Sequence, residues 1–215
     1  MKTAEQQDRR GMEMSRKKYP EEITDEELGS YSYANFEGEI VLVEDDDHLM
    51  KVLPEIRKTK VFGFDTETRP VFRKGRKNGV ALLQLATDRK AYLLRLNKTG
   101  LPQALSEILS SNHIIKAGIA IHDDIKMLQS RNNFTPGGFV DLQTVAQRIG
   151  VKNIGLKKMA AIFLGFKISK KQQVTDWEAG KLTPAQLIYA ATDAWICHQI
   201  YRELEANGSL NVQNT

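Results

Sequence analysis

Four acidic residues occupy hydrophobic stretches of this sequence, where an unpaired charge is costly unless another group compensates it. They are Asp65, Glu67, Asp124 and Asp193. A bound cation is the simplest compensation, and carboxylate oxygens are the ligands that Mg²⁺ and Mn²⁺ prefer. Neither the single Cys197 nor the four scattered histidines have the spacing of a zinc site. The acidic set therefore indicates a site for hard divalent cations.

Asp193 lies in a segment that predicts a long helix over residues 184–206, with its start and its end both marked. At about 100° per residue, Asp193 falls in the interior of the apolar face of that helix rather than at its edge. Tyr189 lies four residues earlier and is therefore its neighbour on the same face. A tyrosine hydroxyl placed there could hold a water molecule against a metal-bound phosphate. The end signals are the capping box Thr183 and Gln186, Pro184 at the first helical position, and Asn207-Gly208.

Asp65 and Glu67 follow the apolar run Val61-Phe-Gly-Phe64, which is typical of a buried central strand. Side chains two residues apart on a strand point to the same face, with α-carbons roughly 6.5 to 7 Å apart. The two carboxylates could therefore share a metal ion at the end of that strand, where ligands collect in open sheets. The alternative is that the strand has ended and both acids are simply solvated.

Asp124 lies where a strand passes into a helix. Ile121, Ile125 and Leu128 recur at helical spacing, which leaves Asp123 and Asp124 in the first turn of that helix. One interpretation is that both acids only complement the helix dipole. Periodicity alone does not choose between that role and metal binding, nor between Asp123 and Asp124.

The length and composition fit one globular domain. A chain of 215 residues with 41% hydrophobic content can bury a substantial core, and a net charge of +4 says little about partners. One cysteine excludes an internal disulfide framework and favours a reducing, cytoplasmic location. Residues 1–38 form a charged segment without the apolar stretch of a secretory signal, and we expect a flexible or loosely docked arm. The domain should span residues 39–208, followed by a tail over residues 209–215. No apolar run in the sequence is long enough for a membrane span.

Short β-rich runs alternate with helical periods along the domain, which predicts a mixed sheet covered by helices. The runs at 61–65, 80–86 and 91–94 are joined by short turns and should pair as an antiparallel meander. Further strands are expected at 39–43 and 113–116. Helices are expected at 45–57, 101–109, 123–131, 141–149, 156–164 and 184–206, with Asp141 more consistent with a helix cap than with a fifth ligand.

Three segments together resemble the exonuclease motifs of the DEDD superfamily. They are Phe64-Asp-Thr-Glu-Thr-Arg-Pro70, His122-Asp-Asp-Ile-Lys-Met-Leu128 and Tyr189-Ala-Ala-Thr-Asp193, whose Tyr-x-x-x-Asp spacing is that of the tyrosine subclass. Together with Val80-Ala-Leu-Leu-Gln-Leu85 and Asp176-Trp177-Glu178, they resemble the exonuclease domain of the Werner-syndrome helicase and its stand-alone relatives, and more distantly ribonuclease D. The similarity covers about residues 40–201. Asp176 stands where relatives often have Asn, and His122-Asp123 replaces a more usual small or acidic pair.

This resemblance implies a ribonuclease H-like fold in a single domain and a metal-dependent 3′-5′ exonuclease. In-line hydrolysis of a phosphodiester needs an activated water and a stabilised leaving 3′ oxygen, which two divalent ions, Mg²⁺ or Mn²⁺, supply. By analogy Asp65 bridges both ions, Glu67 and Asp193 complete the nucleophile-side ion, and Asp124 holds the second largely through water. Alignment with the family favours Asp124 over Asp123, and Tyr189 should orient the attacking water.

A basic loop beside the first motif is a candidate for binding the phosphates of nucleic acid. It spans 69–78 with five basic residues, although a solvated turn between two strands is the alternative. Trp177 could stack on a terminal base or pack in the core, and Gln84 needs a polar partner within an apolar strand. Lys167, Lys170 and Lys171 form a second candidate rim. The expected nucleic-acid contacts are Thr66, Arg69, Arg73, Lys74, Arg76, Lys77, Gln84 and Trp177.

Three functional classes follow from these residues. The leading one is a DNA 3′-5′ exonuclease that acts on DNA 3′ ends and releases nucleoside monophosphates. The second is an RNA 3′-end trimming enzyme of the ribonuclease D kind, which would share the metal site and differ in contacts to the 2′-hydroxyl. The third is a non-catalytic nucleic-acid-binding module, which the joint presence of all four acids and Tyr189 argues against.

Overall fold

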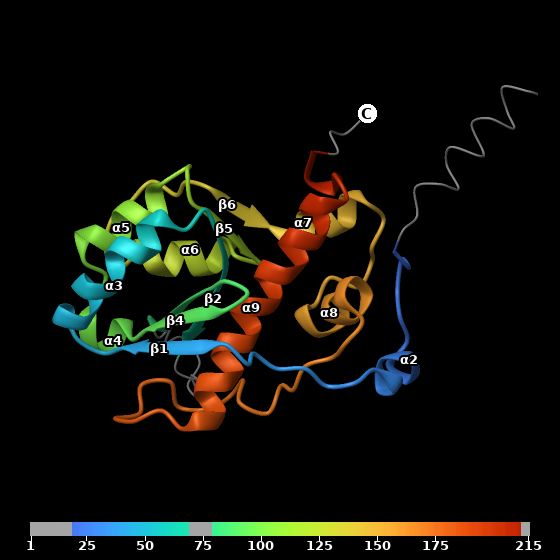
Figure 1. The fold of residues 1–215 in the computed structure, drawn as a ribbon, viewed down its shortest axis with the longest axis horizontal. Helices are drawn as coiled ribbons and strands as arrows, with labels where there is room; N and C mark the ends of the chain where they lie inside the picture. The colour runs from blue at the N-terminus through green and yellow to red at the C-terminus, as the bar shows by residue number, and fades with distance from the viewer. Residues whose placement is uncertain (1–18, 69–78, 212–215) are drawn as a thin grey trace, which may run out of the picture.

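The computed structural model describes residues 19–68 and 79–211, and its centre is a mixed six-stranded sheet (Figure 1). The strand order is β1-β4-β3-β2-β5-β6. The middle strands β2, β3 and β4 pair antiparallel, whereas the outer pairs β1 with β4, β2 with β5, and β5 with β6 are parallel. The strands are β1 Glu39–Val43, β2 Val61–Thr68, β3 Val80–Ala86, β4 Lys90–Leu94, β5 Ile115–Gly118 and β6 Phe139–Asp141.

Helices cover both faces of the sheet, which confirms the predicted architecture (Figure 1). The apolar sides of α3, α5 and α6 pack on one face, and α9 crosses the other face with α8 beside it. The helices are α2 Asp25–Ser30, α3 Asp46–Lys58, α4 Leu96–Thr99, α5 Gln103–Ser110, α6 His122–Gln129, α7 Leu142–Arg148, α8 Leu156–Leu164 and α9 Pro184–Ala206, followed by the 3₁₀ turn Ser209–Asn211. No helix among these is long and apolar enough to cross a membrane.

Strand β2 is the element that positions the first two acids. Phe62 and Phe64 point into the core on the side of α3 and α5. The alternate residue Gly63 faces α9, because a Cβ built there would lie 1.8 Å from the Ala194 carbonyl oxygen of that helix. Period-two alternation then turns Asp65 and Glu67 toward α9 as well. The strand does not end at Asp65, as the sequence suggested, because pairing with β3 extends it through Thr68.

The described part of the N-terminal segment is docked rather than loose, so the expected flexible arm is wrong for residues 19–38. Ile23 and Leu28 are buried in the cluster formed with α8 and α9. The ring of Tyr19 packs edge-on against Phe163 of α8 at 4.6 Å between centroids. The Phe36 backbone amide donates a 2.9 Å hydrogen bond to the Thr192 hydroxyl of α9.

Candidate metal and active site

Helix α9 carries two of the site residues on its buried face. Thr183 and Gln186 form the predicted capping box, and Pro184 opens the helix. Asp193 is 5% exposed and Tyr189 is 8% exposed, so both face the sheet rather than the solvent. Their side chains share a hydrogen bond, and the Asp193 Oδ1 atom has no partner among the described residues. A buried carboxylate oxygen without a partner marks a position that a ligand is needed to satisfy.

Three carboxylates meet between β2 and α9. Oxygen atoms of Asp65, Glu67 and Asp193 all lie within 4.8 Å of one another. Two of these residues come from one face of β2, and the third comes from the turn of α9 that crosses this strand. The structure thus brings together three of the four acids that the sequence singled out.

Asp124 approaches the same strand through a different contact. It lies in the first turn of α6 and is half-buried, and its carboxylate accepts a short hydrogen bond from the Thr66 hydroxyl of β2. Its charge is also close enough to raise the pKa values of Asp65 and Glu67. Asp123, the alternative, is exposed. The hydroxyl of Thr66 thus contacts the fourth acid, and the expected contact of Thr66 with nucleic acid stays a prediction.

Burial and mutual repulsion shift the ionisation of these acids upward. Burial, followed by the charges of Asp193 and Asp124, raises the pKa of Asp65 well above its usual range. The same causes, with Asp65 the strongest of the charges, raise the pKa of Glu67 to about 9. Burial raises the pKa of Asp193 to about 7, although the hydrogen bond from Tyr189 and the charge of Lys170 oppose that shift. Like charges this close are stable together only if protons or a cation neutralise them.

The donor set fits divalent cations such as Mg²⁺ or Mn²⁺. All of the gathered ligands are carboxylate oxygens, which are the hard donors that these ions take. The buried Asp193 Oδ1 atom is an acceptor without a partner among the described residues. Cys197 is buried on α9, and burial raises the pKa of its thiol well above the usual range, which does not favour a thiolate ligand.

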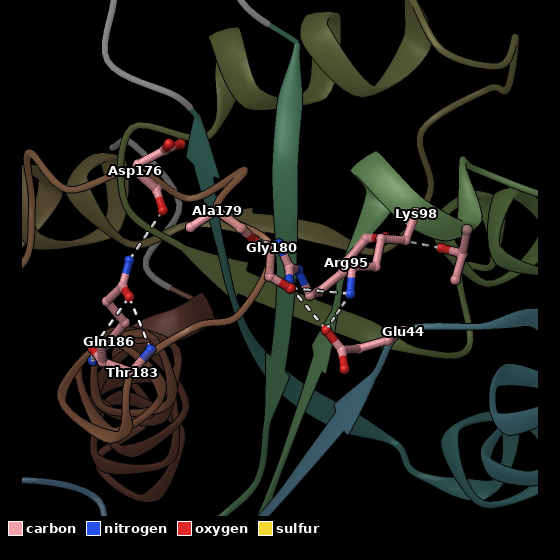
Figure 2. A network of polar contacts seen from close by, with 9 residues as sticks. Glu44, Arg95, Lys98, Asp176, Ala179, Gly180, Thr183 and Gln186 are labelled. Carbon is pink, nitrogen blue, oxygen red and sulfur yellow. Dashed lines mark hydrogen bonds and ion pairs between the residues drawn. The ribbon is translucent and has the colours of Figure 1, made fainter.

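A polar network fixes the loop of residues 176–180, which packs against Tyr189 through Trp177 (Figure 2). The fully buried Arg95 guanidinium donates to the backbone carbonyls of Ala179 and Gly180 and forms a 2.8 Å ion pair with Glu44. Gln186 holds the preceding part of the loop, because its amide nitrogen donates to the Asp176 carbonyl at 3.2 Å.

Trp177 lies between these two attachments. It is fully buried, and its ring is 6.0 Å from the ring of Tyr189. Arg95 was not predicted, and its only sequence signal is a cation directly after the apolar strand Ala91-Tyr-Leu-Leu94.

The expected nucleic-acid contacts fall into those that the structure does not describe and those that it buries. Arg69, Arg73, Lys74, Arg76 and Lys77 lie outside the described residues. Gln84 and Trp177 are fully buried and offer no surface to a strand, so their expected direct contact is wrong for this structure. Gln84 pairs with Asp65 across β3 and β2, and neither of its side-chain polar atoms has a partner among the described residues.

The predicted cap is confirmed at Asp141, whose carboxylate accepts a 2.8 Å hydrogen bond from the Gln143 amide at the start of α7. The residue is therefore occupied as a helix cap. This agrees with the local signal of an acid directly before a helical period.

Comparison with known proteins places this arrangement among nucleases. Residues 40–208 match a family model described as 3′-5′ exonuclease. The chain is 36% identical over 149 residues to exonuclease 3′-5′ domain-containing protein 2 of Drosophila melanogaster, covering 67% of this chain and 25% of that protein. It is 31% identical over 150 residues to the bifunctional 3′-5′ exonuclease/ATP-dependent helicase WRN of Mus musculus, covering 67% of this chain and 11% of that protein.

A solved structure gives the same picture of the fold. The crystal structure of Escherichia coli RNase D, an exoribonuclease, superposes with a TM-score of 0.68 at 26% identity, covering 79% of this chain and 46% of that one. The chain thus spans only part of the length of the relatives it matches, a quarter of the fly protein and about a tenth of the mouse protein.

Proposed function

The chain belongs to the 3′-5′ exonuclease family, with its ribonuclease H-like fold, and on that premise we propose that it shortens DNA from the 3′ end. We further propose that Asp65, Glu67, Asp124 and Asp193 hold two divalent ions, Mg²⁺ or Mn²⁺. The observation that carries this proposal is the cluster of three carboxylates whose ligand oxygens lie within 4.8 Å of one another, one of them on Asp193, which has a buried oxygen without a partner among the described residues.

Two divalent ions in such a site supply water activation and stabilisation of the departing 3′ oxygen. Asp65, Glu67 and Asp193 lie close enough together to share an ion. Asp124 lies apart from that cluster, and the Thr66 hydroxyl orients its carboxylate toward β2. We assign Asp124 to the second ion.

Tyr189 acts as a hydrogen-bond donor in this proposal. Burial and the charges of Asp193 and Glu67 raise the pKa of its hydroxyl far above the usual range, so the group is neutral at every physiological pH. A neutral phenol cannot serve as the general base, but it can orient a water molecule for in-line attack. The Trp177 loop, held by Arg95 and Gln186, fixes the ring that carries this hydroxyl.

DNA is the substrate that we propose, and RNA is the alternative. The mouse relative is named as an exonuclease joined to a helicase, whereas the solved Escherichia coli neighbour is named as an exoribonuclease. In sequence, the mouse relative is 31% identical over 150 residues and ribonuclease D of Shewanella sp. is 29% identical over 168 residues, so we take DNA as the first substrate to test. Because the fold also superposes on that of the exoribonuclease, RNA is the alternative substrate to test. The lone buried Cys197 supports a reducing, cytoplasmic location.

The test is a comparison of matched DNA and RNA strands of one sequence, labelled at the 5′ end and incubated with Mg²⁺ or Mn²⁺. We expect a ladder that shortens from the 3′ end, with kcat/KM higher for DNA. A higher kcat/KM for RNA would overturn the choice of DNA and leave the exonuclease assignment in place. A chimeric strand with one 2′-hydroxyl at the terminal nucleotide then shows whether that group is read at the site.

A further inference from the structure

A groove of about 490 Å³ lies beside Tyr189 on the outer flank of α9. The helix forms its floor through Ile188 and Thr192, next to Tyr189 itself. The docked N-terminal segment forms one wall through Tyr33 and Asn35, and the loop after α8 forms the other through Lys171 and Gln172. Its volume falls in the range of ligand clefts, roughly 300 to 1,000 Å³.

The two walls are held together by backbone hydrogen bonds. The Ala34 amide donates to the Lys167 carbonyl at 3.0 Å, and the Lys167 amide donates to the Ser32 carbonyl at 2.9 Å. The bond from Phe36 to Thr192 fixes the same wall to the floor. The groove therefore exists before any ligand arrives, and a ligand need not order its walls on binding.

The chemistry of the walls is aromatic and cationic. The Tyr33 side chain is 68% exposed, a large value for a tyrosine in a docked segment, and Ile188 on the floor is 40% exposed. The Lys167 ammonium lies over one face of the Tyr33 ring, 4.8 Å from its centre. Lys171 on the opposite wall is exposed, as is its chain neighbour Lys170. None of the described residues that line the groove is acidic. Exposed aromatic rings among lysines are how proteins hold single-stranded nucleic acid, by base stacking and by phosphate contacts.

We propose that this groove binds the single-stranded part of the substrate on the 5′ side of the bond being cut, with a base stacked on Tyr33 and a phosphate beside Lys171. The inference rests on the proposed function, because only a strand whose 3′ end lies at the carboxylates would extend past Tyr189. It assigns the docked N-terminal segment, through Tyr33, to substrate binding.

Tyr33 is tested by replacing it with alanine and, separately, with phenylalanine, which keeps the ring. Binding of a 12-nucleotide strand labelled at the 5′ end is followed by fluorescence anisotropy in EDTA, so that no cleavage is needed for the readout. Stacking on one base is worth enough that Tyr33→Ala should raise Kd at least about fivefold, whereas Tyr33→Phe should bind like the wild type. Met50→Ala, which alters a 62% exposed side chain on α3 across the sheet, is the matched control.

Lys171 is tested through the salt dependence of the same binding reaction. Removing one phosphate contact to a single strand lowers the slope of log Kd against log salt by about 0.7. Lys171→Gln should show that decrease, and Lys51→Gln, a change of an exposed lysine on α3, should not.

Cleavage separates this inference from the proposed function. In this proposal the base stacked on Tyr33 belongs to a nucleotide beyond the two that flank the cut bond. The kcat/KM for a dinucleotide should therefore be the same for Tyr33→Ala and the wild type, while kcat/KM for the 12-nucleotide strand falls. Equal Kd values for wild type, Tyr33→Ala and Lys171→Gln would overturn the groove and leave the nuclease untouched. A wild type that binds the strand but cleaves neither substrate with any divalent ion would instead overturn the proposed function.

Discussion

Replacing Gly63 with alanine should separate the two halves of the carboxylate site. Gly63 lies on β2 two residues before Asp65 and faces α9 at the residue that follows Asp193. A Cβ there would lie 1.8 Å from the Ala194 carbonyl oxygen and 2.5 Å from the His198 amide nitrogen, whereas real contacts are essentially never under 3.0 Å. Both neighbours are backbone atoms of a helix and cannot rotate away. The strand and the helix must therefore move apart by about 1.2 Å, the difference between 3.0 and 1.8 Å.

That displacement can be converted into a loss of activity. A misplacement of about 1 Å in a catalytic constellation costs on the order of 100-fold in rate, because ligands must be held within roughly 0.5 Å of their working geometry. We expect Gly63→Ala to lower kcat/KM at least about 100-fold. The crowding should also lower the free energy of unfolding by about 1 to 3 kcal/mol, the usual cost of overpacking a core.

The assay measures kcat/KM on a labelled DNA strand together with unfolding in urea. Gly29→Ala is the matched control, because a Cβ at that helical glycine has nothing within 4 Å, and it should leave kcat/KM unchanged. A Gly63→Ala protein that unfolds cooperatively and keeps more than about a third of wild-type kcat/KM would refute the reasoning, since the helix would then tolerate the shift.

Three further predictions follow from the same site. Arg95→Met should lower kcat while leaving KM nearly unchanged, and should lower the free energy of unfolding by about 1 to 3 kcal/mol. The reason is that the Ala179 carbonyl loses its Arg95 donor and the Gly180 carbonyl keeps only the 3.4 Å bond from Lys98, while the half-exposed Glu44 keeps its pair with Lys98. A loss confined to KM, measured by steady-state kinetics, would contradict this. Tyr189→Phe should lower kcat at least about tenfold without changing strand binding in EDTA, since only the water-orienting hydroxyl is removed. The pKa of Glu67 is raised to about 9 and that of Asp193 to about 7, so their protonated forms favour the fold at low pH, and that stabilisation is lost as pH rises through these values. The urea concentration at the midpoint of unfolding, measured in EDTA, should therefore fall from pH 5 to pH 9, and Mg²⁺ or Mn²⁺ should restore it most at the upper end. A midpoint in EDTA that rises with pH would contradict the assignment.

The elements that the sequence predicted most accurately are those defined by local signals. Helix α9 begins and ends where Thr183, Pro184 and Asn207 indicated, because caps and an apolar face are contained within the segment itself. The meander of β2, β3 and β4 is also confirmed, since strands that follow one another in the chain pair antiparallel. The three-residue strand β6 and the four-residue helix α4 were missed, because segments so short carry no periodicity.

The features that the sequence could not predict depend on contacts between distant segments. The length of β2 is set by its pairing with β3, and the docking of residues 19–38 is set by the surfaces of α8 and α9. The choice of Asp124 over Asp123 came only from resemblance, because periodicity did not distinguish the two acids, and the bond from Thr66 to Asp124 was not predicted. The burial of Lys116, whose ammonium donates to two carbonyls at the end of α5 and whose pKa burial lowers to about 8, has no local signal.

The most direct test of the central claim is a gel time course on a DNA strand labelled at the 5′ end, comparing wild type with Asp65→Ala and Asp193→Ala. Mg²⁺, Mn²⁺ and EDTA are compared in parallel, and circular dichroism verifies that each variant is folded. We predict a ladder shortening from the 3′ end that requires a divalent ion, with the rate reduced at least about 1,000-fold in each variant, since an ion's charge stabilisation is worth several kcal/mol. Undiminished cleavage by either folded variant, or an equal rate in EDTA, would contradict the claim that these carboxylates hold the catalytic ions.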